Sequence, residues 1–257
     1  MGTPLLPDLR RRLAAGEFLL GTWVTLLDPA VAELLSGSGF DFLVVDGEHG
    51  PHATADLQAT LIAAKASGVA VLARVGANEP VRIMHALDAG VTGVVVPQAR
   101  SVGDVERAVA WCRYPPAGLR GIAPRRAAEW GRRSAEYLAI ANEAVVCCVQ
   151  VETAEAMADL DAMLAVPGLD AVLIGPNDLA AALGHTGQLD HPDVEAAIAR
   201  VLEGGRHTGV PVGIWAPNAP AAAIARREQG FAFVTIGADY VFLAAAADAA
   251  IRAVRAG

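Results

Sequence analysis

The sequence from Val146 to Leu179 reads VCCVQVETAEAMADLDAMLAVPGLDAVLIGPNDL, in which two short apolar segments flank an amphipathic one. The apolar segments, residues 146–152 and 171–175, are almost continuous runs of small and β-branched side chains. Runs of this kind are typical of parallel strands that helices cover on both faces of the sheet. The segment between them, residues 153–164, has the apolar spacing of a surface helix. The stretch therefore predicts a strand, a crossover helix and a second parallel strand.

The same alternation continues along the whole chain. Strands are expected at residues 20–25, 42–46, 71–75, 93–97, 146–152, 171–175, 212–215 and 233–237. Eight βα units without a linker or a low-complexity break favour a closed (β/α)8 TIM barrel over an open doubly wound sheet, and 257 residues suit one such barrel. We expect a single domain over residues 1–257, with a short N-terminal helix at residues 4–15 and a C-terminal helix after the last strand.

Composition excludes several classes of protein. The formal net charge of -8 argues against nucleic acid as a partner, because phosphate binding needs a basic face. Residues 242–250 are apolar but contain Asp248 and are too few to span a membrane, and residues 1–12 lack the apolar segment of a signal peptide. The three cysteines form no CxxC motif, which suits reduced thiols. A cytoplasmic protein without membrane partners is expected.

Lysine is almost absent from this chain. Lys65 is the single lysine, and it lies in an alanine-rich helical segment well before the next strand. An enzyme that works through a Schiff base needs a lysine in its active site. Lys65 is badly placed for that role, so electrophilic catalysis must come from another group.

Polar residues follow the expected strands at the point where each strand ends. The active site of a (β/α)8 barrel is built at the carboxyl ends of its strands, so these side chains are expected to converge on one face. They are Asp46, Glu48, His49, Arg74, Gln98, Gln150, Glu152, Asn177, Asp178 and Trp215.

Glu152 and Asp178 are the candidate metal ligands. Residues two apart in a strand share a face, so Gln150 and Glu152 both point into the barrel mouth. Two carboxylates on neighbouring strand ends supply hard oxygen ligands that suit Mg²⁺ or Mn²⁺, with Co²⁺ as a substitute. The alternatives are that Glu152 pairs with an arginine or caps a helix, and that Asn177 or Asp178 is an ordinary helix N-cap.

His49, Arg74 and Asp88 are weaker candidates. His49 is the natural general base if a carboxylate orients it, although a loop histidine is often structural or exposed. Arg74 suits a carboxylate or a developing enolate oxygen, and its alternative is a structural pair with Glu48 or Asp46. Asp88 stands at a helix end, where the simplest interpretation is a turn residue.

Six motifs in this order resemble those of a known family. They are DGEH at 46–49, LDAG at 87–90, GVVVP at 93–97, YPPAGLRG at 114–121, QVE at 150–152 and IGPNDL at 174–179. The chain resembles the HpcH/HpaI aldolases, the 2,4-dihydroxyhept-2-ene-1,7-dioate and 2-dehydro-3-deoxyglucarate aldolase type of the pyruvate/phosphoenolpyruvate barrel superfamily. The resemblance extends from residue 21 to about residue 237.

The resemblance implies roles for these residues. Glu152 and Asp178 would ligate a divalent cation, Arg74 would stabilise an enolate, and His49 would move a proton with Asp88, or with Asp46 as the second choice. The implied substrate-binding residues are Gln150, Gly175, Pro176, Asn177, Asp178, Trp215 and Trp23, with backbone amides around Asn177 receiving the pyruvate carboxylate. The family also implies a homohexamer, a dimer of trimers with helices exchanged between barrels.

A class II aldolase is the function that these features predict. It would cleave 4-hydroxy-2-oxo acids reversibly to pyruvate or hydroxypyruvate and an aldehyde. One alternative is an acyl-CoA lyase of the malyl-CoA or citramalyl-CoA type, for which only the arginines at 125–126 and 132–133 offer a nucleotide-binding loop. Another is a catalytically silent metabolite-binding barrel. Residues 76–80 read GANEP where many relatives have Pro-Trp-Asn, and residues 215–218 lack an acidic residue often seen there, so the aldehyde stays open.

Overall fold

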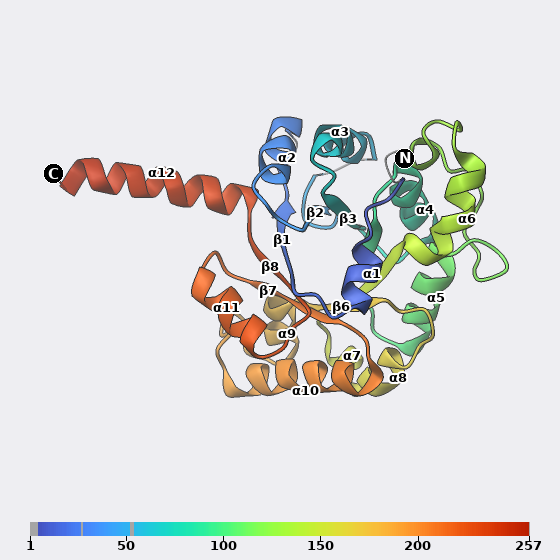
Figure 1. The fold of residues 1–257 in the computed structure, drawn as a ribbon. Helices are drawn as coiled ribbons and strands as arrows, with labels where there is room; N and C mark the ends of the chain where they lie inside the picture. The colour runs from blue at the N-terminus through green and yellow to red at the C-terminus, as the bar shows by residue number, and fades with distance from the viewer. Residues whose placement is uncertain (1–4, 27, 52–53, 257) are drawn as a thin grey trace.

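Eight parallel strands close into a barrel in the computed structural model, which describes residues 5–26, 28–51 and 54–256 (Figure 1). Each strand pairs with its sequence neighbour, and β1 pairs with β8 to complete the barrel. The predicted (β/α)8 fold is confirmed, and every expected strand is present within about two residues of its predicted bounds. The strands are β1 Leu19–Val24, β2 Phe42–Asp46, β3 Ala70–Arg74, β4 Gly93–Val96, β5 Val146–Val151, β6 Ala171–Ile174, β7 Val212–Ala216 and β8 Phe233–Ala238.

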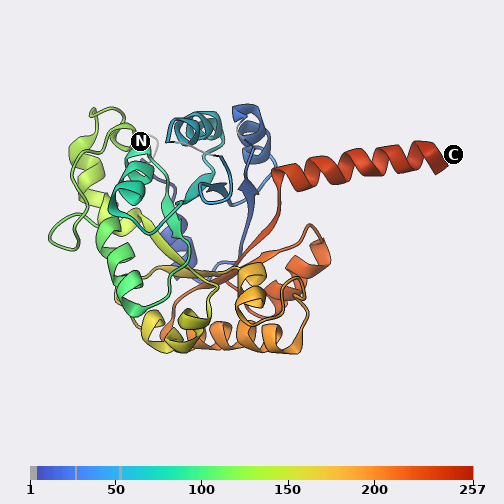
Figure 2. The same ribbon diagram turned by 180° about the vertical axis from the view of Figure 1, so that it is seen from behind.

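Helices surround the barrel in both views (Figures 1 and 2). The segment expected as one helix at 153–164 is divided at Asp159 into two short ones, and a helix appears at 134–144 where none was expected. Of the helix expected at 4–15, residues Leu9–Ala14 are helical. The helices are α1 Leu9–Ala14, α2 Pro29–Ser36, α3 Thr54–Ala64, α4 Pro80–Ala89, α5 Val102–Cys112, α6 Ser134–Ala144, α7 Ala154–Ala158, α8 Leu160–Leu164, α9 Pro176–Ala182, α10 Pro192–Thr208, α11 Pro220–Glu228 and α12 Asp239–Ala256, with 3-10 turns at Lys65–Ser67 and Arg126–Ala128.

The strands are apolar on both faces, as the sequence predicted. Outward side chains pack against the helices, while a second cluster of buried side chains fills the barrel interior. Within this interior the rings of Phe42 and Phe233 meet edge to face, with 6.0 Å between centroids. Gly21 and Gly213 make room for these rings, because a Cβ at either position would overlap the neighbouring phenyl group. Leu9 and Leu13 of α1 belong to the same cluster, so α1 packs against the interior of the barrel.

The strand register determines which polar residues meet. Asp46 at the end of β2 lies beside Arg74 at the end of β3, and Val151 of β5 lies beside Ile174 of β6. The residues that follow Val151 and Ile174 therefore emerge together at the carboxyl end of the barrel. Glu152 and the segment that carries Asp178 are brought to the same place by this pairing.

Helix α12 projects away from the barrel in both views (Figures 1 and 2). Its apolar side chains Leu243, Ile251 and Val254 are exposed, and Asp239 at its first residue is its one buried side chain. Asp239 accepts hydrogen bonds from the backbone N–H groups of Thr25 and Leu26 and from the Thr25 hydroxyl, all at 2.6–2.8 Å. The base of the helix is thus tied to the end of β1. Among helices in the described part of the chain, none has both the length and the apolar character needed to cross a membrane.

Candidate active site at the carboxyl ends of the strands

A pocket of about 600 Å³ opens at the carboxyl end of the barrel. All of the predicted site residues line it except Glu152, which is buried, and Asp88. Those that line it are Trp23, Asp46, His49, Arg74, Gln150, Gly175, Pro176, Asn177, Asp178 and Trp215. The expected convergence of strand ends is therefore present in the geometry.

Arg74 is held in a fixed position by Asp46. Its Nε lies 2.9 Å from Asp46 Oδ1 and its Nη2 lies 2.7 Å from Oδ2, which is the paired fork geometry of strong arginine–carboxylate contacts. The guanidinium also packs over the ring of Trp23, 4.5 Å from its centroid. Burial alone would raise the pKa of Asp46, but hydrogen bonding and the charge of Arg74 outweigh burial and lower it.

The edge of the Arg74 guanidinium that does not contact Asp46 faces the rest of the site. Its Nη1 lies 3.3 Å from Gln150 Oε1 and 3.1 Å from Glu48 Oε2. The structural pairing weighed as an alternative for Arg74 therefore occurs with both Asp46 and Glu48. It does not remove Arg74 from the pocket, because the residue lines the cavity while it is paired.

Glu152 lies under the pocket and is almost fully buried. Its Oε1 accepts hydrogen bonds from the backbone N–H and the side-chain amide of Gln98, at 2.8 and 3.1 Å, and its Oε2 accepts one from Gln150 Nε2 at 2.7 Å. Gly175 makes this position possible, because a Cβ at residue 175 would collide with Glu152 Oε2. Burial raises the pKa of Glu152 to about 7; the Gln98 N–H and Arg74 lower it.

Carboxylates crowd this end of the barrel. The charges of Asp178 and Glu48 both raise the pKa of Glu152, which places the three groups within electrostatic reach of one another. Burial raises the pKa of Glu48, and Asp46 and Asp178 add to that rise while Arg74 and His49 oppose it. Because Asp46 already pairs with Arg74, this one guanidinium does not fully neutralise the negative charges of Glu48, Glu152 and Asp178. Carboxylate oxygens are the ligands that a hard divalent cation prefers, which makes Glu152 and Asp178 the candidate pair. Glu48, Glu152 and Asp178 do not, however, form a group of three with ligand atoms within 4.8 Å of one another.

His49 occupies the mouth of the pocket with an exposed side chain. Its imidazole Nε2 lies 3.9 Å from Glu48 Oε2. Asp46 accepts a hydrogen bond from the backbone N–H of His49, at 3.2 Å, and so fixes the turn that carries the residue. Within one chain, the aspartate that contacts His49 is therefore Asp46, through the backbone N–H of His49.

Asp88 does not belong to this group within one chain. It lies near the C-terminal end of α4, which runs back toward the start of β4 at the opposite end of the barrel. There Arg120 Nη2 donates to Asp88 Oδ1 at 2.7 Å, and the Arg120 guanidinium packs over Tyr114 and Tyr137. Within one chain, Asp88 does not take part in the pocket that contains His49, because helix α4 carries it to the opposite end of the barrel.

Glu48, Gln98 and Tyr240 were not predicted as site residues. Glu48 and Gln98 had been noted only as polar residues after a strand. The backbone of Gln98 adopts a positive φ of 53°, and its N–H donates a hydrogen bond to Glu152. Tyr240 lines the pocket from the base of α12. The available signal was position, since each of these residues follows a strand at its carboxyl end.

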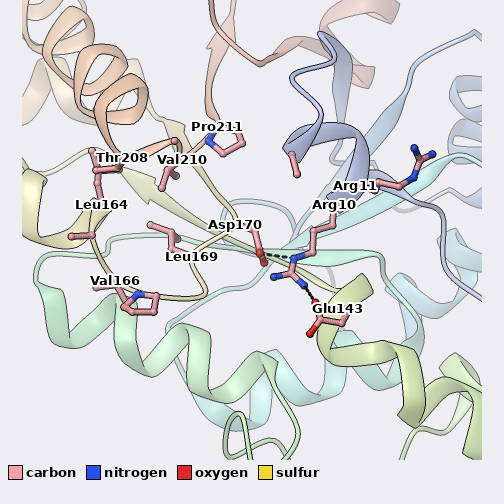
Figure 3. Close-up of a pocket in the computed structure, with 14 residues that line it drawn as sticks. Arg10, Arg11, Glu143, Leu164, Val166, Leu169, Asp170, Thr208, Val210 and Pro211 are labelled. Carbon is pink, nitrogen blue, oxygen red and sulfur yellow. Dashed lines mark hydrogen bonds and ion pairs between the residues drawn. The ribbon is translucent and has the colours of Figure 1, made fainter.

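A larger pocket of about 760 Å³ lies at the amino-terminal end of the strands (Figure 3). Arg10 reaches from α1 to Asp170, with 2.6 Å between Nε and Oδ1, and to Glu143 at 3.4 Å. Asp170 also pairs with Arg113 at 2.6 Å. The charged side chains Arg10, Glu143 and Asp170 of this pocket are thus engaged in ion pairs. Catalytic residues of (β/α)8 barrels come from the carboxyl ends of the strands, so this pocket is not the candidate active site.

Comparison with known proteins agrees with the motifs. Residues 19–246 match the family described as HpcH/HpaI aldolase/citrate lyase. A 5-keto-4-deoxy-D-glucarate aldolase of Shigella boydii serotype 18 is 39% identical over 239 residues, which is 92% of each chain. The resemblance to this family is confirmed.

Solved structures of similar proteins share the whole fold. An HpcH/HpaI aldolase/citrate lyase family protein from Burkholderia cenocepacia J2315 has a TM-score of 0.93 at 40% identity, covering 97% of this chain and 99% of that one. An HpcH/HpaI aldolase from Desulfitobacterium hafniense DCB-2 has a TM-score of 0.89 at 27% identity, covering 96% of both chains.

The raised pKa of Glu152 predicts a specific pH dependence of stability in metal-free buffer. Its folded-state pKa of about 7 exceeds the ordinary value of 4.5, so the folded protein holds this proton more tightly than the unfolded chain does. The free energy of unfolding should fall as the pH rises from 5 to 8, by on the order of 3 kcal/mol from this group. Glu152→Gln should abolish this part of the pH dependence in urea unfolding, whereas Glu155→Gln, on the exposed face of α7, should retain it. Equal pH dependence in wild type and Glu152→Gln would contradict the prediction.

Proposed function

This chain belongs to the HpcH/HpaI aldolase/citrate lyase family, and we propose that it cleaves 4-hydroxy-2-oxo acids reversibly into pyruvate or hydroxypyruvate and an aldehyde. It is a carbon–carbon lyase of the aldolase type, as its relatives are. The observation that carries the specific proposal is the pocket in which Arg74 faces a group of carboxylates. No lysine is available for the Schiff-base route, since Lys65 lies on the outer side of the barrel after α3.

The substrate class follows from the relatives and from the pocket. The compound named for the Shigella relative, 5-keto-4-deoxy-D-glucarate, is a six-carbon diacid with an oxo group next to one carboxylate. Counted from that end, it is a 4-hydroxy-2-oxo acid, and cleavage between its third and fourth carbons releases pyruvate. We include this diacid among the candidate substrates of the present chain.

Glu152 and Asp178 would hold a divalent cation, and Mg²⁺, Mn²⁺ and Co²⁺ are the candidates. The support is the acidic, oxygen-rich group around Glu152, whose raised pKa is partly due to Asp178 and Glu48. A bound cation supplies Lewis acidity, which polarises the carbonyl of a 2-oxo acid. Gln98 and Gln150 orient the Glu152 carboxylate by donating hydrogen bonds to its two oxygens.

Arg74 would stabilise the enolate. Retro-aldol cleavage moves the electrons of the breaking C3–C4 bond onto the C2 oxygen, where negative charge develops. A guanidinium already fixed by Asp46 and Trp23 needs little reorganisation to meet that charge, which is how a preorganised group lowers a barrier. Backbone amides around Asn177 and Asp178 would receive the substrate carboxylate, and Gln150 would add a hydrogen bond.

His49 would accept the proton from the 4-hydroxyl group as the aldehyde leaves. The support is its position at the pocket mouth, where an exposed imidazole can exchange protons with solvent. Asp46 would position the turn through the backbone N–H of His49. Protonation of the enolate at C3 then gives pyruvate. Trp23 and Trp215 supply aromatic surface to the pocket wall.

The acyl-CoA lyase alternative has less support. Its only candidate nucleotide-binding arginines lie in the 114–133 loop, which joins the ends of α5 and α6 at the amino-terminal end of the barrel. Arg126 donates to the carbonyl oxygens of Ala89 and Leu61, and Arg133 pairs with Glu136. Within one chain, these groups are remote from the pocket and are engaged by the protein itself.

Removal of divalent cations tests the proposal directly. Dialysis against EDTA should reduce pyruvate release from 5-keto-4-deoxy-D-glucarate and simpler 4-hydroxy-2-oxo acids by at least about 100-fold, and Mg²⁺, Mn²⁺ or Co²⁺ should restore it. Synthesis from pyruvate or hydroxypyruvate with a panel of acidic and neutral aldehydes would then identify the acceptor. Full turnover by the stripped enzyme would refute metal dependence, and no cleavage of any substrate with any cation would refute the aldolase.

Arg74→Ala should lower kcat/KM for cleavage by about 100-fold to 1,000-fold, because the enolate loses its charged partner. Arg74→Lys keeps the charge but loses the fork geometry and should recover only part of the rate. Exchange of the pyruvate methyl protons, followed by NMR, should slow in parallel. Arg107→Ala, on the exposed face of α5, is the control and should retain wild-type rates. A folded Arg74→Ala enzyme with normal exchange would exclude Arg74 from enolate formation.

We further propose that α12 is exchanged between copies of the chain in a homohexamer, a dimer of trimers. The support is the projecting helix with its exposed side chains Leu243, Ile251 and Val254. An apolar helix of this kind needs a partner surface to bury it.

Paired substitutions in α12 test this assembly. Leu243→Asp with Ile251→Asp should reduce the mass measured by sedimentation velocity to that of smaller species, because charge on the apolar stripe opposes burial. Asp248→Asn, on the same exposed helix, should leave the mass unchanged. A wild-type chain that sediments as a monomer would refute the proposal.

A further inference from the structure

Two histidines and an aspartate meet on the surface between α9 and α10. His185 Nε2 lies 3.0 Å from Asp193 Oδ2, and His191 Nδ1 lies 3.7 Å from the same oxygen. In the described residues, these form the one group of three histidine, cysteine or acidic side chains whose candidate ligand atoms all lie within 4.8 Å of one another. None of them belongs to the aldolase pocket.

We propose that His185, His191 and Asp193 form a second divalent-metal site, of the zinc type. A tetrahedral zinc ion with bonds of about 2.0–2.1 Å keeps its ligand atoms roughly 3.3 Å apart. The two distances to Asp193 Oδ2, 3.0 and 3.7 Å, lie on either side of that spacing. Two imidazoles and one carboxylate leave the fourth position for water, as in open zinc sites.

Present contacts show what the ion would replace. The imidazole rings of His185 and His191 are stacked, with 3.5 Å between centroids and 16° between planes. His191 Nδ1 also accepts a hydrogen bond from the backbone N–H of Asp193, at 3.2 Å, as the N-cap of α10. Binding requires one ring to rotate so that both nitrogens point at the ion. The two histidines are partly exposed and Asp193 is exposed, so this rotation would take place at the protein surface.

The site would stiffen the connection from α9 to α10. The backbone N–H of His185 donates to the carbonyl oxygen of Ala180, at 2.8 Å, so His185 is bonded directly to the end of α9. Asp178 lies in the first turn of the same helix. An ion bound at His185 would therefore join the end of α9 to the start of α10 and restrain the helix that carries Asp178.

Ligand chemistry separates this site from the pocket. Imidazole nitrogen favours zinc and other late transition metals, whereas the carboxylates around Glu152 favour magnesium or manganese. Zinc should therefore occupy the histidine site in the presence of excess Mg²⁺. This inference does not depend on the aldolase reaction.

Calorimetric titration with Zn²⁺ in excess Mg²⁺ tests the proposal, using the Glu152→Gln chain so that the pocket does not compete. One zinc ion per chain is expected, and adding His185→Gln should weaken its binding by at least about 100-fold. Adding His207→Gln instead should leave binding unchanged, because His207 lies elsewhere on α10, 3.3 Å from Glu203, and is the matched control. Zinc at about 100 times its Kd should raise Tm by about 5 °C only when His185 is present.

Two outcomes would overturn the proposal. Equal zinc binding with and without His185→Gln would show that the ion binds elsewhere, and no binding by the Glu152→Gln chain would show that the three side chains do not form a site. His185→Gln in the otherwise wild-type chain should leave Mg²⁺-supported aldol cleavage within about twofold. Failure of the aldolase assay would not alter the zinc count, so the two proposals fail separately.

Discussion

Charge balance at the carboxyl end of the barrel is the constraint on which the site depends. Asp46 uses both of its oxygens on Arg74, and the net effect of that contact is a lowered pKa. Glu48 takes up Nη1 of the same guanidinium, at 3.1 Å, and the pKa values of Glu48 and Glu152 rise. Glu152 is the buried member of this group, and a buried carboxylate is costly unless hydrogen bonds, a proton or a cation stabilise it. This imbalance supports the proposal that a cation binds beside Glu152.

The fold could be predicted almost completely, because burial on both faces leaves an unmistakable pattern in each strand. The helices were harder to predict from the sequence. Residues 153–164 keep one apolar spacing, so nothing in their composition marks the break at Asp159 between α7 and α8. Helix α6 was missed because only Tyr137 and Ala141 are buried on it, too narrow a face to produce a clear pattern.

The site was predictable wherever strand direction determines position. Arg74 and Gln150 are on strands whose carboxyl ends face the pocket, and the sequence pattern places both. The hydrogen bond from Gln98 to Glu152 could not be predicted, because it depends on a positive φ that the residue type does not indicate. Within one chain, Asp88 lies away from His49, because the direction of helix α4 carries it toward the start of the next strand.

The contacts of Asp239 have a consequence for protein synthesis. This residue, just after β8, binds the backbone that follows β1, and its neighbour Tyr240 forms part of the pocket wall. The first and last strands must also pair before the barrel can close. A ribosome therefore makes the carboxylates around Glu152 long before it makes the residues that finish the cavity. Without the final segment, a sheet of the first seven strands would have two unpaired edges, and the pocket would lack the wall that Tyr240 supplies.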